Sequence, residues 1–164
     1  VRSVFARTAS LVNRIEVEDC ASISMEMVNG SLASLSATLG SAQEISRHRF
    51  CFSNLTAESN TKPYSNSDDP WTFTGDSDAI NHQIVEALAA FQPGRSGFEE
   101  QFEGLYKAII MDTEPPVGLA DARSLLEIMT GVYESAQTNQ MVELPITKEN
   151  PRYMGWAPEK PGAS

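Results

Sequence analysis

The sequence predicts an α+β fold, a two-layer sandwich in which a mainly antiparallel sheet of about six strands carries helices on one face. Three observations lead to this prediction. Segments within residues 1–74 alternate apolar and polar residues, which is the two-residue period of a strand. Residues 78–138 repeat apolar residues three and four positions apart, the period of a helix face. Strands followed by helices are typical of helices gathered on one face of an antiparallel sheet.

The clearest strand pair is a hairpin turned at Asn29-Gly30, a dipeptide that tolerates the positive φ angles of a tight turn. In residues 20–28, Ile23 and Met25 alternate with polar side chains, and residues 31–39 return with a leucine and alanine face. The opposite face is rich in Ser, Thr and Ala rather than Lys and Glu. We expect this open face to meet a second subunit; the alternative is a solvated Ser/Thr face.

Shorter segments complete the predicted sheet. Residues 1–7, 45–52, 55–58 and 71–74 are expected to be strands, and residues 141–144 are expected to form a last edge strand. Residues 59–70 are rich in Asn, Ser and Asp and contain two prolines, so they are expected to form a loop.

Three helices are expected at residues 78–91, 98–112 and 119–138. Pro93-Gly94 and Pro115-Pro116 separate them. Ser96 and Glu99 have the spacing of a capping box, in which each side chain satisfies a free backbone N–H at the helix start. The middle helix places one apolar stripe along its length: Phe98, Phe102, Leu105, Tyr106, Ile109 and Ile110.

Composition excludes several classes of protein. The 164 residues suffice for one domain, and the net charge is −10, from 12 Lys and Arg against 22 Asp and Glu. An acidic chain without a basic cluster predicts neither a nucleic-acid partner nor a membrane partner, because phosphates bind cations. Cys20 and Cys51 are expected to be buried free thiols, which favours a cytoplasmic setting. Because the chain begins with Val1, it is expected to be a piece of a longer protein.

Several motifs, in order, resemble one family of NAD(P)-dependent oxidoreductases. They are Val17-Glu18-Asp19, Asn29-Gly30, Leu35-Ser36-Ala37-Thr38, and residues 117–156 with Tyr133-Glu134-Ser135-Ala136 and Asn150-Pro151-Arg152-Tyr153-Met154-Gly155-Trp156. Their succession resembles the second domain of the glucose–fructose oxidoreductase/inositol dehydrogenase (Gfo/Idh/MocA) family. The resemblance implies that residues 1–164 are a single C-terminal domain for substrate binding and oligomerisation, with residues 157–164 as a flexible tail.

The resemblance also implies that the catalytic half is missing. The family acts on sugars, polyols or related hydroxy compounds with NAD or NADP, which an N-terminal Rossmann domain binds. Its catalytic Lys lies in a Glu-Lys-Pro motif, and its catalytic Asp and His precede the second domain. Here Glu159-Lys160-Pro161 stands in the wrong place, and no Gly-rich dinucleotide turn is present. We therefore expect no catalytic, cofactor-binding or metal-binding residue, no bound cofactor and an inactive chain by itself.

The weak candidates for substrate contact are Arg47, His48 and Arg49, because strands of this domain help to wall the family's substrate pocket. Side chains alternate along a strand, so only the two arginines or the histidine can face the pocket. The alternative is pairing with acidic residues on the sheet surface. Four carboxylates lack the spacing of a calcium loop and are expected to be ordinary loop residues: Asp68, Asp69, Asp76 and Asp78.

Two other functions stay open at this point. A standalone binding or dimerisation module with the same fold would perform no redox step. The sequence that precedes Val1 would distinguish such a module from a domain of an oxidoreductase. A small hydrolase that uses Asp68 and Asp69 is the third alternative, without a nucleophile motif to support it.

Overall fold

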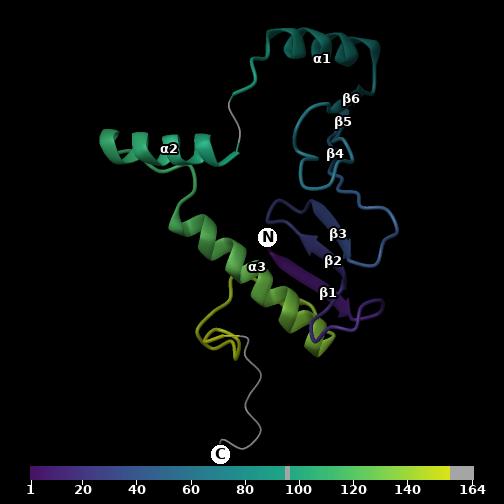
Figure 1. The fold of residues 1–164 in the computed structure, drawn as a ribbon, viewed down its shortest axis with the longest axis vertical. Helices are drawn as coiled ribbons and strands as arrows, with labels where there is room; N and C mark the ends of the chain where they lie inside the picture. The colour runs from purple at the N-terminus through teal and green to yellow at the C-terminus, as the bar shows by residue number, and fades with distance from the viewer. Residues whose placement is uncertain (95–96, 156–164) are drawn as a thin grey trace, which may run out of the picture. The chain divides into compact units, whose positions relative to one another are not determined.

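The computed structural model describes residues 1–94 and 97–155 (Figure 1) and confirms the α+β class. Two compact units divide the chain: one comprises residues 1–40 and the chain from Gln101 onward, and the other comprises residues 41–100. In the described residues, the strands form two antiparallel sheets, of four and three strands, where one sheet of about six was expected. Ser96, Trp156, Glu159-Lys160-Pro161 and the expected tail at 157–164 lie outside the described residues.

The sheet of the first unit has the order β3-β2-β1-β7. Its strands are β1 (Ser3–Ala9), β2 (Cys20–Glu26), β3 (Leu32–Thr38) and β7 (Val142–Glu143). Every neighbouring pair is antiparallel. The predicted hairpin turn joins β2 to β3, with Gly30 at φ +84° and the N–H of Met27 donating to the carbonyl of Ser31 at 2.8 Å. Only a residue without a Cβ adopts that φ freely.

The register of this sheet confirms the two predicted faces of the hairpin. Ile23 lies opposite Ala6 on one side and Leu35 on the other, which builds the apolar face. Ser24 lies opposite Phe5 and Ser34, which builds the open face of small polar residues. A shift by one residue would exchange the two faces, so the apolar pattern alone specifies the register.

Helix α3 (Leu119–Thr138) packs against β1 on the apolar face (Figure 1), whereas Leu35 on β3 is 49% exposed. Gly131 makes this approach possible, because a Cβ at that position would lie 2.8 Å from Cγ1 of Val4. Val4, Val142 and Ile146 form the core next to the helix. Ser135 is fully buried; its Oγ accepts the N–H of Ala6 at 2.9 Å and donates to the carbonyl of Gln140 at 2.6 Å.

The ends of α3 follow from local chemistry, and the helix spans the predicted residues 119–138. At the start, the Asp121 carboxylate accepts the N–H of Gly118 at 2.8 Å. At the end, Asn139 adopts a left-handed conformation with φ +56°, and its N–H donates to the carbonyl of Ser135 at 2.8 Å. Asn is one of the few residues that adopt this conformation routinely.

Among the described residues, no helix is apolar and long enough to cross a membrane.

The second unit contains a sheet of order β4-β5-β6 and helix α1 (Asp78–Ala90). Its strands are β4 (Arg49–Cys51), β5 (Leu55–Glu58) and β6 (Thr72–Gly75). The predicted strand at 45–52 is shorter in the structure, because the N–H of His48 donates to the Ser59 side chain at 2.9 Å instead of to a backbone carbonyl. Ser77 caps α1 by accepting the N–H of Ile80 at 3.4 Å.

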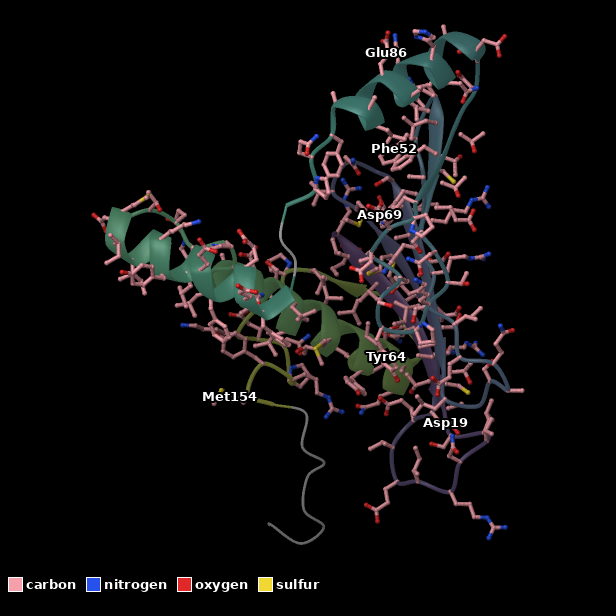
Figure 2. All side chains as sticks on the ribbon, turned by 45° about the horizontal axis from the view of Figure 1, so that its top comes forward. Asp19, Phe52, Tyr64, Asp69, Glu86 and Met154 are labelled. Carbon is pink, nitrogen blue, oxygen red and sulfur yellow. The ribbon has the colours of Figure 1, made fainter. Side chains whose placement is uncertain are left out.

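The segment before β2 is held by one buried carboxylate. Asp19, labelled in Figure 2, is 3% exposed and accepts the N–H groups of Leu11 at 2.8 Å, Val12 at 2.9 Å and Asn13 at 2.6 Å. The backbone donors from Asn13, Leu11 and Val12 hold the pKa of Asp19 far below its ordinary value, against the opposing effect of burial. The ionised form of Asp19 therefore stabilises the loop at residues 10–13.

We expect Asp19→Asn to reduce stability near neutral pH and to flatten its pH dependence. Because folding lowers the pKa of Asp19, its stabilisation is complete well above about pH 4, the ordinary Asp value, and is lost as pH falls further. Urea unfolding of both proteins from pH 7 to pH 3 measures this difference. Curves that stay parallel across the whole range would contradict the assigned role of the ionised carboxylate.

Candidate functional site

Strand β4 and the two residues before it place the candidate substrate residues on two different faces of the small sheet. Arg49 lies opposite Glu58, whereas Phe50 lies opposite Ala57. Since successive side chains alternate, Arg47 and Arg49 share one face and His48 lies on the other with Phe50. The structure thus brings the two arginines together and separates them from the histidine.

The face with the arginines is polar. Arg47 Nη1 lies 3.5 Å from Glu58 Oε1, and Arg49 Nε lies 3.9 Å from Glu58 Oε2, so one carboxylate lies near two guanidinium groups. The arginine side chains are 59% and 60% exposed. Alternation and register define this polar face as Arg47, Arg49, Cys51, Thr56, Glu58, Thr72 and Thr74.

The thiol of Cys51 is free and exposed, so its expected burial was wrong; Cys20 is free and half-buried.

The polar face has the chemistry of an oxygen-binding surface. Guanidinium groups bind carboxylates and phosphates through several N–H donors, and threonine hydroxyls both donate and accept. Two guanidinium groups beside one carboxylate leave a local excess of positive charge. The arrangement suits an anionic, hydroxylated ligand, and its arginines are suited to orienting such a ligand rather than to abstracting a proton.

The opposite face carries a row of rings. His48 and Phe50 have ring centroids 6.2 Å apart, Phe50 and Trp71 lie 6.1 Å apart, and Trp71 and Phe73 lie 6.4 Å apart, with planes within 25° of parallel. Ala57, between Phe50 and Phe73 in the register, is 6% exposed. The rings pack over this alanine and form the apolar layer of the small sheet. The shared face of His48 and Phe50 was predicted; Trp71 and Phe73 were missed, although their alternate spacing is visible.

The loop between β5 and β6 is organised by Asn60. Its Nδ2 lies within hydrogen-bond distance of the carbonyls of Ser65, Asn66 and Asp68, at 3.3, 3.3 and 2.6 Å, and its Oδ1 accepts the N–H of Lys62 at 2.7 Å. The loop is attached to the ring row because Trp71 Nε1 donates to the carbonyl of Ser67 at 3.0 Å.

The described residues of this loop do not form a cluster of metal ligands. Its Tyr64, labelled in Figure 2, is 95% exposed with φ +61°. Across residues 1–94 and 97–155, no three His, Cys, Asp or Glu side chains gather to hold a metal ion.

We expect Glu58→Gln to change the free energy of unfolding by less than about 1 kcal/mol, because exposed ion pairs contribute little. Chemical denaturation at low salt measures the change, with Thr61→Ala in the adjacent loop as the control. A loss above about 2 kcal/mol would show that Glu58 holds both guanidinium groups as part of the fold, which would leave them unavailable to a ligand.

Solved structures share this fold, whereas the sequence matches no protein-family model and no curated protein. The WlbA dehydrogenase from Bordetella pertussis, solved with NADH and UDP-GlcNAcA, matches 90% of this chain at 21% identity and a TM-score of 0.69. The aldose–aldose oxidoreductase from Caulobacter crescentus, complexed with glycerol, matches 87% at 19% identity and a TM-score of 0.63. An oxidoreductase from Agrobacterium radiobacter, in complex with NAD⁺, L-tartaric acid and magnesium, matches 87% at 16% identity and a TM-score of 0.60.

The match covers only a part of each of these proteins. The chain spans 41% of the first two and 43% of the third. The neighbours are oxidoreductases of the glucose–fructose oxidoreductase/inositol dehydrogenase type. The chain therefore has the fold of a part, about two fifths in length, of oxidoreductases of this type.

Proposed function

We propose that this chain is the C-terminal, substrate-binding and oligomerisation domain of an NAD(P)-dependent oxidoreductase that acts on a sugar, a polyol or a related hydroxy compound. The observation that carries the proposal is the coverage: about nine tenths of this chain corresponds to about two fifths of the WlbA dehydrogenase, solved with NADH and UDP-GlcNAcA. A second domain would supply the remainder and bind the nicotinamide cofactor, which accepts or gives the hydride.

The described residues do not fit the cofactor. A dinucleotide needs a Gly-rich turn from a strand into a helix, where free N–H groups and the helix dipole meet the pyrophosphate. The turn from β6 into α1 has a single glycine, Gly75, followed by the acidic residues Asp76 and Asp78. Ser77 already accepts the N–H of Ile80 at that helix start. The negative charges would repel a pyrophosphate, which supports a cofactor site elsewhere in the full-length protein.

The polar face is this chain's proposed contribution to substrate binding. Arg47 and Arg49 would bind an anionic group of the substrate, and Thr72 and Thr74 would bind hydroxyl groups. Such contacts hold the reacting carbon against the cofactor ring, which lowers the entropic barrier to reaction. His48, on the other face, has no part in this arrangement.

We expect the isolated chain to show no binding of NAD(H) or NADP(H) by isothermal titration calorimetry up to about millimolar cofactor, a usual upper limit for enzyme sites. The full-length gene product should bind one of the two cofactors in the same calorimetric experiment. Micromolar binding by the isolated chain would overturn the assignment of the cofactor to another domain. A full-length product that binds neither cofactor would favour a module without redox function.

The open face of the first sheet is the proposed oligomer interface. Ser22, Ser24, Ser34 and Ser36 lie on this face with Phe5, and all four serines are exposed. Small neutral side chains allow a second sheet to approach closely without burying unpaired charges. The same patch on two copies would form an isologous interface about a two-fold axis.

We expect the chain to be at least dimeric by light scattering at micromolar concentration, and Ser24→Arg to lower its mass. Ser24 lies at the centre of the open face, where an arginine would hold two sheets apart and bury a charge at the two-fold axis. Gln43→Arg, which adds the same charge outside that sheet, is the control and should leave the mass unchanged. A Ser24→Arg protein with unchanged mass would refute the sheet interface.

A further inference from the structure

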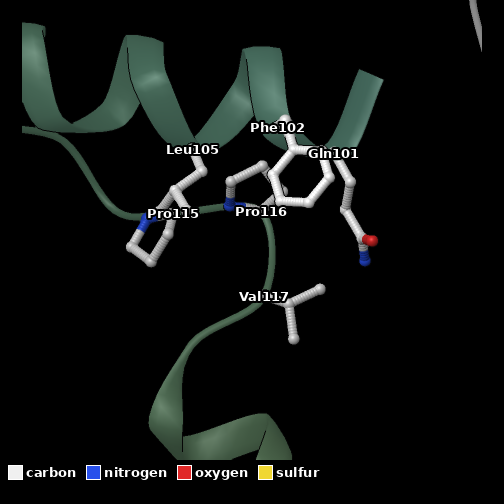
Figure 3. A pocket seen from close by; sticks show the side chains of 6 residues that line it. All are labelled: Gln101, Phe102, Leu105, Pro115, Pro116 and Val117. Carbon is white, nitrogen blue, oxygen red and sulfur yellow. The ribbon is translucent and has the colours of Figure 1, made fainter. Parts of the chain in front are cut away.

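Helix α2 (Gly97–Met111) and the segment that follows it enclose a shallow recess, which Figure 3 shows. The helix and this segment are in close contact, since a Cβ on Gly104 would lie 2.7 Å from Pro116. The described residues that line the recess include no acid, base or nucleophile: Gln101, Phe102, Leu105, Pro115, Pro116 and Val117. The recess is therefore suited to packing, and a reactive pair of groups lies elsewhere, at the turn between β2 and β3.

The turn between β2 and β3 contains the one asparagine of the sequence that a glycine follows, Asn29 before Gly30. The backbone nitrogen of a residue can attack the side-chain amide of an asparagine directly before it, and a five-membered succinimide ring then forms. A side chain on the attacking residue obstructs this step, and glycine has none. The pair therefore combines an electrophile with an unhindered backbone nucleophile.

The structure folds the Asn29 side chain back along the main chain. Its Oδ1 accepts the N–H of Ser31 at 3.1 Å, which is a bond from an asparagine side chain to the backbone two residues further on. The ring that this hydrogen bond closes contains the nitrogen of Gly30. The bond therefore limits how far the side-chain carbonyl carbon can move from the attacking atom.

A second donor is directed at the same oxygen. The Oγ of Ser31 donates to Oδ1 of Asn29 at 2.8 Å. As the nitrogen of Gly30 attacks, the side-chain carbonyl carbon becomes tetrahedral and its oxygen takes up negative charge. Donors that are already in place stabilise this charge more than they stabilise the neutral amide. The turn thus provides two oxyanion donors for its own asparagine.

One contact opposes the reaction. The N–H of Gly30 donates to the carbonyl of Met27 at 2.9 Å, and this bond must open before the nitrogen loses its proton. A single backbone hydrogen bond contributes little net free energy in water, so it slows the reaction without preventing it. All of these contacts lie within residues 27–31, so the geometry is a property of this one hairpin.

We propose that Asn29 is a site of spontaneous modification, which converts it to aspartate and isoaspartate while Ser31 stabilises the transition state. Solvent base takes the proton of the Gly30 nitrogen, and this nitrogen forms a bond to Cγ of Asn29. The Cγ–Nδ2 bond breaks, and the departing nitrogen takes a proton from solvent and leaves as ammonia. Water then opens the succinimide ring. Cleavage at Cγ gives aspartate, whereas cleavage at the main-chain carbonyl carbon gives isoaspartate.

Isoaspartate changes the hairpin, because its main chain runs through the former side chain and is one atom longer between β2 and β3. The turn fixes the register of a hairpin, and here the N–H of Met27 closes it by donating to the carbonyl of Ser31 at 2.8 Å. Strand β3 ends the sheet order β3-β2-β1-β7, so β2 is its one partner among the described residues. The modification therefore weakens the pairing of β3. This inference is independent of the proposed function, since it needs neither a cofactor nor a substrate.

Ageing of the whole folded chain in mildly alkaline buffer tests the proposal, with isoaspartate at residue 29 measured by peptide mapping and mass spectrometry. We expect conversion at Asn29 and none at Asn54, which precedes Leu55 in the turn after β4. Ser31→Ala should slow the conversion by about twofold to tenfold, the usual effect of one hydrogen bond. Ser31→Thr keeps a hydroxyl and Ser34→Ala removes one elsewhere on β3, so both should convert at the rate of the parent chain.

Unfolding in urea separates the effect of the turn from the effect of the local sequence. The unfolded parent chain and unfolded Ser31→Ala should convert at equal rates, because the bonds to Oδ1 of Asn29 are lost. The proposal is overturned if the folded parent forms no isoaspartate at residue 29 in the time that the unfolded parent needs. It is also overturned if folded Ser31→Ala converts as fast as the parent, or if the substitution slows both forms equally.

Thermal unfolding of the aged chain gives a second readout. The matched control is Asn29→Asp, which carries the same added charge on a main chain of unchanged length. We expect the isoaspartyl chain to unfold at a lower temperature than Asn29→Asp, because only the isoaspartyl chain has a longer turn. Equal unfolding temperatures would overturn the assigned effect on the pairing of β3.

Discussion

The first unit depends on the close approach of helix α3 to strand β1. Gly131 removes the one side-chain atom that would collide with Val4, and this lets the helix backbone lie on the strand. The contact also satisfies a backbone hydrogen-bond donor. The short strand β7 pairs with Ser3 and Val4 of β1, so the N–H of Ala6 has no partner on that strand. Ser135 accepts that N–H within the packed layer. Close packing and hydrogen-bond satisfaction therefore require the same position of the helix.

The remaining surfaces of the two units differ in chemistry. Within the first unit, helix α3 packs against β1 on the apolar face of the sheet, whereas the four serines of the open face are exposed. The side chains of this open face are small and neutral. Small side chains favour sheet-on-sheet contact. The polar face of the second sheet, with two arginines near one carboxylate, is suited to a small anionic ligand rather than to a protein layer.

Local patterns predicted much of this architecture. The hairpin at Asn29-Gly30, the faces of β2 and β3 and both ends of α3 are as expected, because alternation and turn chemistry are properties of neighbouring residues. The split of Arg47 and Arg49 from His48 also followed from alternation alone. Contacts between distant segments were missed: Asp19 binds the N–H groups of Leu11, Val12 and Asn13, and Trp71 joins the ring row across the sheet.

The sequence by itself determined the fold class, the order of the elements and the composition of each face, because these depend on residue type and short spacing. Only the tertiary structure decided that the strands form two sheets and that the strand at 45–52 shortens to β4. It also decided that Cys51 is exposed and that Glu58 lies near both arginines. A strand extends only as far as its partner, and the exposure of a side chain depends on what covers its face. Neither property is contained in the segment that carries the residue.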